Sequence, residues 1–219
     1  MTKIEHQSLS DRAYGEIRKG LITGLFAPMQ PLVIRSLAES YGISATPIRE
    51  ALQRLVAERL LVALPNRSIV VPAMTQNRFR ELFPIRAALE GLATQLATPQ
   101  LTKADKVRMA RLLERIAETT TSFDARSYMK LNREFHFLVY EKSGNPELLR
   151  LIQDMWLKVG PVFNGLFDDD HYRDHANDKH LDIYNAIIAG NATHARQAME
   201  QDLLLAAQSL LPRLPDQAS

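Results

Sequence analysis

The stretch IRSLAESYGISATPIREALQRL, residues 34–55, decides the fold of the N-terminal part of the chain. Apolar residues at helical spacing predict a short helix around Arg35–Tyr41, a turn at Gly42 and a longer helix over about Ser44–Glu58. Pro47 is compatible with the longer helix because it lies in the first turn, where backbone N–H groups have no intrahelical partner. Two helices joined by a glycine turn are typical of a helix-turn-helix.

The longer predicted helix carries polar residues on the face opposite its apolar one. Arg49 and Gln53 are four residues apart and therefore project in the same direction, near Thr46. Arginine suits bidentate contact with guanine and glutamine suits adenine, while a hydroxyl of Ser44 or Thr46 at the helix start can bind a phosphate. These residues predict a DNA-reading face, and the alternative is an ordinary solvated helix surface.

Flanking segments complete a predicted domain over residues 1–72. Downstream, two apolar and partly β-branched runs, LLVALP and SIVVP, flank Asn66 and Arg67 and predict a hairpin, or wing, with Arg67 adding positive charge at its tip. Upstream, a helix is predicted from Ser10 to near Gly24. Its apolar face is formed by Ala13, Ile17, Leu21 and Leu25.

Residues 73–219 are predicted to form a second domain made only of helices. Amphipathic stretches, about six in number, alternate with short breaks. The breaks are predicted near Pro99, Thr121–Asp124, Gly144–Pro146, Pro161–Asp174 and Gly190–Asn191. Because such helices pack through their apolar faces, the predicted fold class is mainly α, with a winged helix-turn-helix followed by an all-helical antiparallel bundle.

Charge and composition limit the function. Residues 1–72 contain nine Lys and Arg against six Asp and Glu, whereas residues 73–219 contain eighteen against nineteen, so the basic excess belongs to the domain expected to bind nucleic acid. The chain has no cysteine, which excludes disulfides and thiolate metal sites. It shows neither a secretory signal pattern nor an apolar run of ~20 residues, so we expect a cytoplasmic protein with no membrane contact.

The sequence does not support catalysis. A di-iron bundle needs paired Glu-x-x-His motifs, and a nucleophilic triad needs a serine in a nucleophile elbow or a cysteine, and the chain has none of these. We therefore expect a regulator and not an enzyme. An architectural DNA-binding protein without an effector is the other alternative.

The run SATPIREALQRL, followed by the predicted hairpin, resembles the GntR superfamily of bacterial regulators, whose typical form reads close to SRTPVREALxRL. The resemblance covers residues 10–72. It implies that Arg35, Thr46 and Arg49 contact double-stranded DNA, with Ser44 supporting the helix start. Since one recognition helix reads only a few base pairs, we expect a homodimer on a palindromic operator.

Three positions depart from the pattern of this superfamily. Ala45 stands where a DNA-contacting arginine is usual, which removes one contact. Arg59 and Ser68 stand where glycines are usual, before the wing and at its tip. A β-carbon at Ser68 puts the wing contacts in question, although Arg67 can compensate with its charge.

The remainder, over about residues 76–210, is similar to the FCD domain of the FadR subfamily. The similar segments are IRAALEGLATQLA, NREFHFLVYEKSGNPEL and KHLDIYNAIIAGNATHARQAMEQDL. The resemblance implies a transcription regulator whose operator affinity is controlled by a small-molecule effector, such as an organic acid, bound in the C-terminal domain.

The resemblance also implies a candidate metal site. FCD domains often hold a metal through an aspartate, a histidine four residues later and two further histidines, at positions that here are Asn132, His136, His180 and Asp202. Two imidazoles, a carboxylate and an amide oxygen can bind a divalent ion such as Zn²⁺ or Ni²⁺. The alternative is that His136 and His180 line an effector cavity that contains no metal.

Arg86 lies in the R-x-x-L-E pattern of the same subfamily. The resemblance places it near the start of the first sensing helix, where it can bind an effector carboxylate together with His136 and His180. An ion pair between Arg86 and Glu90, four residues later, is the alternative.

Overall fold

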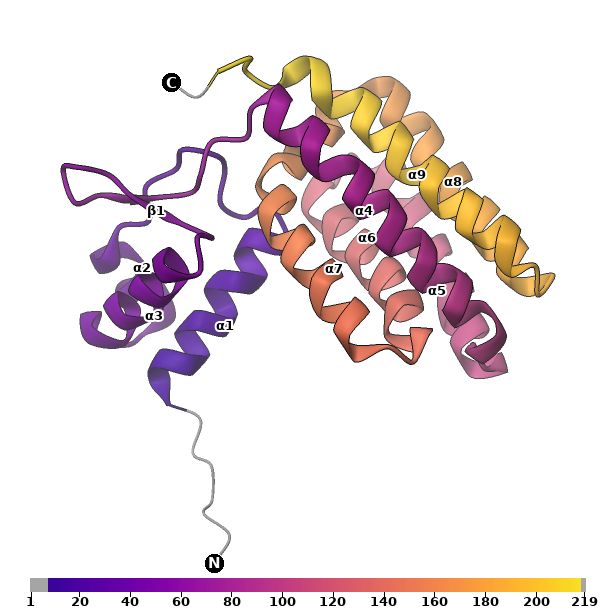
Figure 1. Ribbon diagram of the computed structural model, residues 1–219, viewed down its shortest axis with the longest axis horizontal. Coiled ribbons are helices and arrows are strands. Elements are labelled where there is room, and N and C mark those ends of the chain that lie inside the picture. The colour runs from indigo at the N-terminus through magenta and orange to yellow at the C-terminus, as the bar shows by residue number, and fades with distance from the viewer. Residues whose placement is uncertain (1–7, 218–219) are drawn as a thin grey trace, which may run out of the picture.

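Two groups of helices make up the protein, shown in Figure 1 as a computed structural model that describes residues 8–217. The N-terminal group has three helices and a two-stranded antiparallel sheet. Its elements are α1 (Leu9–Ile22), α2 (Ile34–Tyr41), α3 (Ala45–Ala57), β1 (Val62–Ala63) and β2 (Ile69–Val70). The winged helix-turn-helix predicted from the sequence is confirmed.

The C-terminal group is a bundle of long α-helices with short 3-10 segments, which confirms the predicted all-helical domain. α9 packs against both α8 and α4, and α5 packs against α6 and α8. No helix among the described residues is long and apolar enough to cross a membrane. The helices are α4 (Gln76–Ala97), α5 (Lys103–Thr121), α6 (Ala125–Tyr140), α7 (Pro146–Val159), α8 (Asp170–Ile188) and α9 (Ala192–Leu210).

Local sequence explains where several helices begin. Thr102 and Asp105 form a reciprocal capping box at the start of α5, and each satisfies a backbone N–H of the other. Asn145 caps α7 and is followed by Pro146 at the first helical position, where proline is favoured. These caps define where α5 and α7 begin.

The core of the N-terminal domain lies between α1 and α3. Ile17 and Leu21 from α1 and Ile48, Leu52 and Leu55 from α3 are all fully buried. Between α2 and α3, Gly42 adopts a φ of 65°, a left-handed conformation that favours glycine. This turn reverses the chain between α2 and α3, which also pack against each other.

A third segment of the chain pairs with the two strands of the wing, which the sequence did not predict. Val62 pairs with Val70, and Ala63 pairs with Ile69, as expected for a hairpin. In addition, Pro31 forms a β-bridge with Val70, and the Leu32 N–H donates to the Ile69 carbonyl at 2.8 Å. The segment before α2 therefore anchors the second strand of the wing.

Two sequence predictions were wrong in detail. α1 ends at Ile22, and Leu25 is 54% exposed, because Gly24 turns the chain with a φ of 70° before Leu25 can join the apolar face. The predicted break over 161–174 is shorter, since a 3-10 segment (Gly160–Asp168) is followed at once by α8. Asp169 makes this early start possible, because its carboxylate accepts the Tyr172 N–H as a helix cap.

The two domains touch through α1, which packs against α7 and the following 3-10 segment (Figure 1). A β-carbon on Gly160 would lie 2.3 Å from the Leu21 carbonyl oxygen, so this close approach requires glycine. Arg18 also pairs with Asp154 across the boundary at 3.5 Å. Because α1 packs against α3 as well, it connects the bundle to the predicted recognition helix.

Candidate functional site

α3 separates its residues into a buried and an exposed face. Ile48 and Leu52 are fully buried against the domain, while Thr46, Arg49 and Gln53 are exposed. The side chains predicted to read DNA are therefore free to approach a ligand.

Arg35, Ser44 and Arg49 line one shallow surface hollow of about 690 Å³ between α2 and α3. Arg35 is exposed and pairs with Glu39 at 3.1 Å. Ser44 is the N-cap residue of α3, but its side chain makes no capping hydrogen bond, so its hydroxyl is available to another acceptor or donor. Ala45 also lines the hollow and offers no side-chain donor there.

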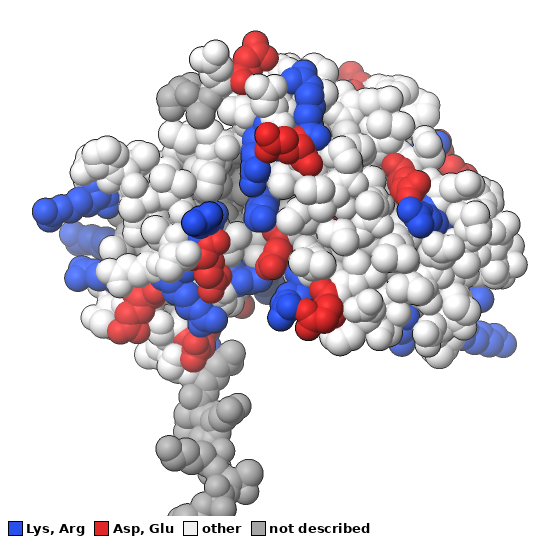
Figure 2. Space-filling view, viewed as in Figure 1, with Lys and Arg blue, Asp and Glu red and all other residues white. Residues whose placement is uncertain are grey.

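The wing tip carries its charge as predicted. Arg67 is exposed and adopts a φ of 66°, whereas Ser68 lies at a normal φ and donates its backbone N–H to the Asn66 side chain at 3.0 Å. The left-handed position of the tip is therefore filled by arginine. Figure 2 shows basic side chains projecting from the end of the molecule that carries the wing and α2.

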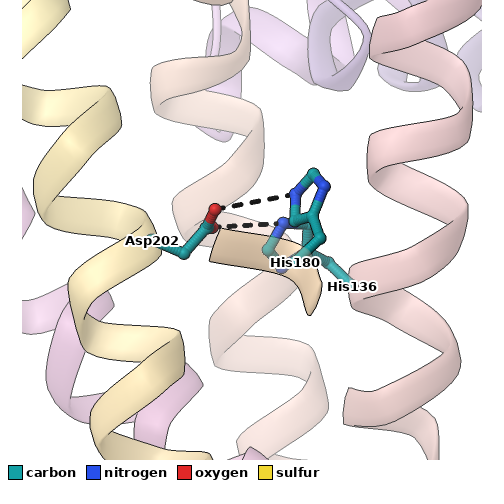
Figure 3. A group of neighbouring side chains, drawn as sticks. All are labelled: His136, His180 and Asp202. Atoms are coloured by element: carbon teal, nitrogen blue, oxygen red, sulfur yellow. Dashed lines mark ion pairs between the residues drawn. The ribbon is translucent and has the colours of Figure 1, made fainter. Parts of the chain in front are cut away.

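Three buried side chains from three helices meet inside the bundle (Figure 3). His136 comes from α6, His180 from α8 and Asp202 from α9. His136 Nε2 lies 3.4 Å from Asp202 Oδ2, and His180 Nε2 lies 3.6 Å from Asp202 Oδ1. One potential ligand atom from each of the three side chains lies within 4.8 Å of the other two, and no other such group of histidine, aspartate or glutamate is found within residues 8–217.

The geometry and the unsatisfied atoms of this group fit a divalent metal. Ligands at about 2.0–2.1 Å around a tetrahedral ion lie roughly 3.3 Å apart, close to the two distances observed. Both ring nitrogens of His180 and Oδ1 of Asp202 are buried without a hydrogen-bond partner within the described part of the chain. Such orphaned atoms are costly in a protein interior, and a cation would satisfy two of them, His180 Nε2 and Asp202 Oδ1.

Burial controls the protonation of the three groups. It lowers the pKa of His180 to about 3, and it lowers the pKa of His136 well below the usual range, with further contributions from His180 and Arg86. Burial also raises the pKa of Asp202 to about 7, and the Glu90 carboxylate adds to this rise. Both imidazoles are therefore neutral at pH 7, the state that a metal ligand requires.

A hydrogen-bond chain fixes the orientation of His136. The Tyr140 hydroxyl donates to Glu90 Oε2 at 2.6 Å and lies 3.0 Å from His136 Nδ1. Since the hydroxyl proton is engaged by Glu90, the Tyr140 oxygen accepts from Nδ1–H of His136. His136 Nε2 then presents its lone pair to the Asp202 side, as in metal sites whose histidines are oriented by an outer partner.

Arg86 and Glu90 form the buried ion pair that was the alternative prediction for Arg86. Arg86 Nε donates to Glu90 at 2.7 Å, and the pair is almost completely buried, with side-chain exposures of 3% and 0%. Trp156 Nε1 donates to the same carboxylate at 3.0 Å. The guanidinium of Arg86 is thus already engaged by Glu90. An effector-binding role for Arg86 stays a prediction.

The remaining predicted ligand, Asn132, is buried on α6 one turn before His136. Its ligand role stays a prediction. Sequence reasoning missed Glu90 as a shared acceptor and Tyr140 as the partner of His136. The spacing of His136 and Tyr140, four residues apart on one helix, was the available signal.

Comparison with known families identifies both parts of the chain. Residues 9–71 match the family described as bacterial regulatory proteins, gntR family. Residues 81–204 match the FCD domain.

Related proteins agree along nearly the whole length. The HTH-type transcriptional regulator McbR of Escherichia coli (strain K12) is 31% identical over 182 residues, which cover 82% of each chain. The solved structure of E. coli McbR/YncC superposes with a TM-score of 0.87 at 27% identity and covers 94% of this chain and 98% of that one. A GntR regulator structure from Rhodococcus sp. RHA1 superposes with a TM-score of 0.72 at 26% identity, over 92% of this chain and 97% of that one.

Proposed function

The chain belongs to the GntR family of bacterial transcription regulators and carries an FCD effector-binding domain, and from this premise we propose how it reads DNA and senses its effector. Members of this family regulate transcription and are not enzymes. A regulator of bacterial DNA acts in the cytoplasm, which is where we place this protein. The domain boundary proposed from the sequence lies between residues 72 and 73.

The DNA contacts proposed here divide into base contacts and phosphate contacts. Arg49 and Gln53 on the exposed face of α3 are assigned to base edges in the major groove. Ser44 and Thr46 at the helix start are assigned to phosphate, together with exposed arginines on α2 and at the wing tip, Arg35 and Arg67. The observation that carries this assignment is the shared surface hollow of Arg35, Ser44 and Arg49.

The proposed DNA-bound form is a homodimer on a palindromic operator. A single α3 reaches only a few base pairs, so two copies related by a twofold axis double the contacts. Half-sites centred about one helical turn or a multiple of it apart are expected.

The proposed sensing centre is a divalent ion, Zn²⁺ or Ni²⁺, held by His136, His180 and Asp202, with Asn132 as a fourth ligand. The observation that carries this proposal is the convergence of three buried side chains from three helices, two of which, His180 and Asp202, have unsatisfied atoms. When bound, such an ion supplies a positive centre that an effector carboxylate can approach. Arg86 would serve the same carboxylate only by exchanging its partner Glu90.

The proposed route from this centre to DNA runs through α7 and α1. Tyr140 connects His136 to Glu90, and Glu90 accepts from Trp156 on α7. α7 packs against α1, which packs against α3. A change at the centre that moves Trp156 therefore displaces a helix in contact with the DNA-binding domain.

Binding measurements on an operator selected from random DNA, together with metal analysis of the purified protein, test these proposals. We expect metal analysis to find one ion per chain, and we expect operator affinity to change when the ion is removed or a small carboxylate is added. Gly160→Ala should weaken this coupling, because a β-carbon at Gly160 meets the Leu21 carbonyl of α1. Gly165→Ala is the matched control, since its added carbon finds only an ordinary contact at 3.7 Å.

Absence of a stoichiometric ion in carefully purified protein would contradict the metal centre and favour a cavity lined by neutral histidines. A strictly monomeric complex on an asymmetric site would contradict the proposed dimer. Equal metal and effector responses in Gly160→Ala and Gly165→Ala would remove the route through α1.

A further inference from the structure

A cleft of about 90 Å³ lies where the DNA-binding domain meets the bundle. The turn between α3 and β1, the segment 71–74 that leads into α4, the first turns of α4 and the end of α7 form its walls. The floor is apolar and buried, with Leu60, Leu82 and Leu157 among its residues. A ligand in this cleft would contact both domains at once.

Three cationic side chains and no acidic side chain line the cleft. Two of them, Arg59 and Lys158, form no ion pair within residues 8–217. Arg78 pairs with Glu81 at 2.9 Å, but the two side chains are 52% and 65% exposed, and Glu81 does not line the cleft. Exposed pairs of this kind contribute little, so Arg78 can also serve a second anion. Figure 2 shows basic side chains at the boundary between the two domains.

Arg59 holds a backbone conformation that favours glycine. It follows the C-cap of α3 with a φ of 58°, and the surrounding hydrogen bonds, Leu60 N–H to Leu55 and Arg59 N–H to Val56, are those of a glycine-type helix end. A side chain at this position adds steric strain. Strain that persists at a position lining a cleft is an indication of function.

We infer that this cleft binds a small oxyanion, of the size and charge of inorganic phosphate or a short carboxylate, between Arg59, Arg78 and Lys158. Arginine guanidinium groups and a lysine ammonium are the donors that proteins use for such oxygens. A cavity needs roughly 10–15 Å³ to hold one water, so about 90 Å³ has room for a small oxyanion. The apolar floor lowers the local dielectric and strengthens the attraction.

This site is separate from the buried centre at His136 and from the exposed face of α3. The bound ion bridges cations of the two domains, Arg59 from one and Arg78 and Lys158 from the other. It therefore stabilises the arrangement of the DNA-binding domain against the bundle seen in this structure.

Thermal unfolding of the full chain in titrated sodium phosphate, against sodium chloride at equal ionic strength, tests the inference. The wild type should show a saturable rise in Tm that chloride does not reproduce. Arg59→Gly should lose most of this rise while gaining roughly 2–4 °C in phosphate-free buffer, because the strain is removed. Lys158→Gln should also lose the phosphate response.

Arg67→Gly is the matched control, because Arg67 has the same residue type and a φ of 66° but lies at the wing tip. It should gain Tm in the same way and keep the full phosphate response. An equal phosphate response in Arg59→Gly and Arg67→Gly, or a response that chloride reproduces, overturns the site. Both variants leave His136, His180 and Asp202 intact, so the comparison does not depend on the buried centre.

Operator affinity in phosphate-free buffer distinguishes a free ion from a phosphate of the DNA backbone. Arg59 follows the C-terminal end of α3, whereas Ser44 and Arg49 lie toward its N-terminal end. Arg59→Gly should therefore bind operator within about twofold of wild type. A larger loss would assign the cleft to bound DNA and overturn the free-ion site.

Discussion

On α3 the side chains proposed to contact DNA, Thr46, Arg49 and Gln53, are exposed, whereas in the bundle the proposed metal ligands His136 and Asp202 are buried with their neighbours. The exposed set can be changed without disturbing a core, so its effects should appear in DNA binding alone. The buried set holds unsatisfied atoms in an apolar interior, so its effects should appear in both ligand binding and folding. The two regions therefore predict different signatures for substitutions.

The largest expected effect is at His136. His136→Ala removes one imidazole ligand and opens a cavity in the core, so stoichiometric metal should fall from about one ion per chain to nearly none. Elemental analysis and thermal unfolding measure the two consequences. His194→Ala, at an exposed position on α9, should change neither. An unchanged metal content in His136→Ala would contradict the assignment.

The second effect concerns Asp202 and depends on pH. Its pKa is about 7 in the native state and about 3.9 in an unfolded chain, so without metal the carboxyl costs stability increasingly as pH rises from 4 to 7, and fully above 7. Asp202→Asn in chelator should therefore be more stable than wild type at pH 8, by on the order of 2–4 kcal/mol, and close to it at pH 4.

Zinc should reverse this order at pH 8, because the ion needs the Asp202 carboxylate. Thermal unfolding of wild type and Asp202→Asn across pH, with chelator and with Zn²⁺, measures both differences. Both proteins retain the buried His136 and His180, whose titration differs between them only through the charge of Asp202, 3.4 and 3.6 Å away. A difference that does not grow between pH 4 and pH 8 would contradict the buried position of Asp202.

The sequence predicted the DNA-binding region better than the sensing region, for a physical reason. Gly42, Pro47 and the apolar spacing of α3 are local signals that act within a few residues. Hydrophobic spacing identified the bundle helices in the same way, but it does not determine which buried polar residues meet. The meeting of His136, His180 and Asp202 followed from family resemblance, and the residues that orient His136 did not follow from it.

Long-range contacts account for the other omissions. Glu90 accepts from Tyr140 and Trp156, which are 50 and 66 residues away in the chain. Pro31 pairs with the wing although prolines at that point only suggested a turn. The error at Leu25 has a local cause instead, because the backbone turn at Gly24 ends the helix before Leu25 can continue its spacing.

The third effect distinguishes base contacts from phosphate contacts in the DNA-binding domain. Arg49→Ala should cost on the order of 1–3 kcal/mol in operator binding and should relax sequence preference, because a bidentate base contact is lost. Arg67→Ala at the wing tip should weaken operator and random DNA to similar extents. Binding titrations on both DNAs, at one salt concentration, test the pair. Equal losses on operator and random DNA for Arg49→Ala would contradict base reading.

The smallest expected effect is a change in metal affinity in Asn132→Asp, and it is the most specific test of the buried centre. Asn132 supplies at most a neutral oxygen from α6, one turn before His136. If it faces the ion, Asn132→Asp adds a negative charge of nearly the same shape, and metal affinity should rise on the order of tenfold. Chelator should then destabilise this variant more than wild type, because the added carboxylate loses its partner.

Without a metal the same substitution has the opposite sign. Asn132→Asp would bury an unpaired carboxylate in the interior that also contains Asp202, whose own pKa is already raised by burial and by Glu90. Like charges in an apolar interior repel and are poorly solvated, so the variant would unfold at lower temperature whether or not Zn²⁺ is present. Melting temperatures of wild type and Asn132→Asp with Zn²⁺ and with chelator therefore decide whether the four side chains form a metal centre. A gain in stability that appears only with Zn²⁺ supports the centre, and a loss under both conditions supports a cavity that contains no metal.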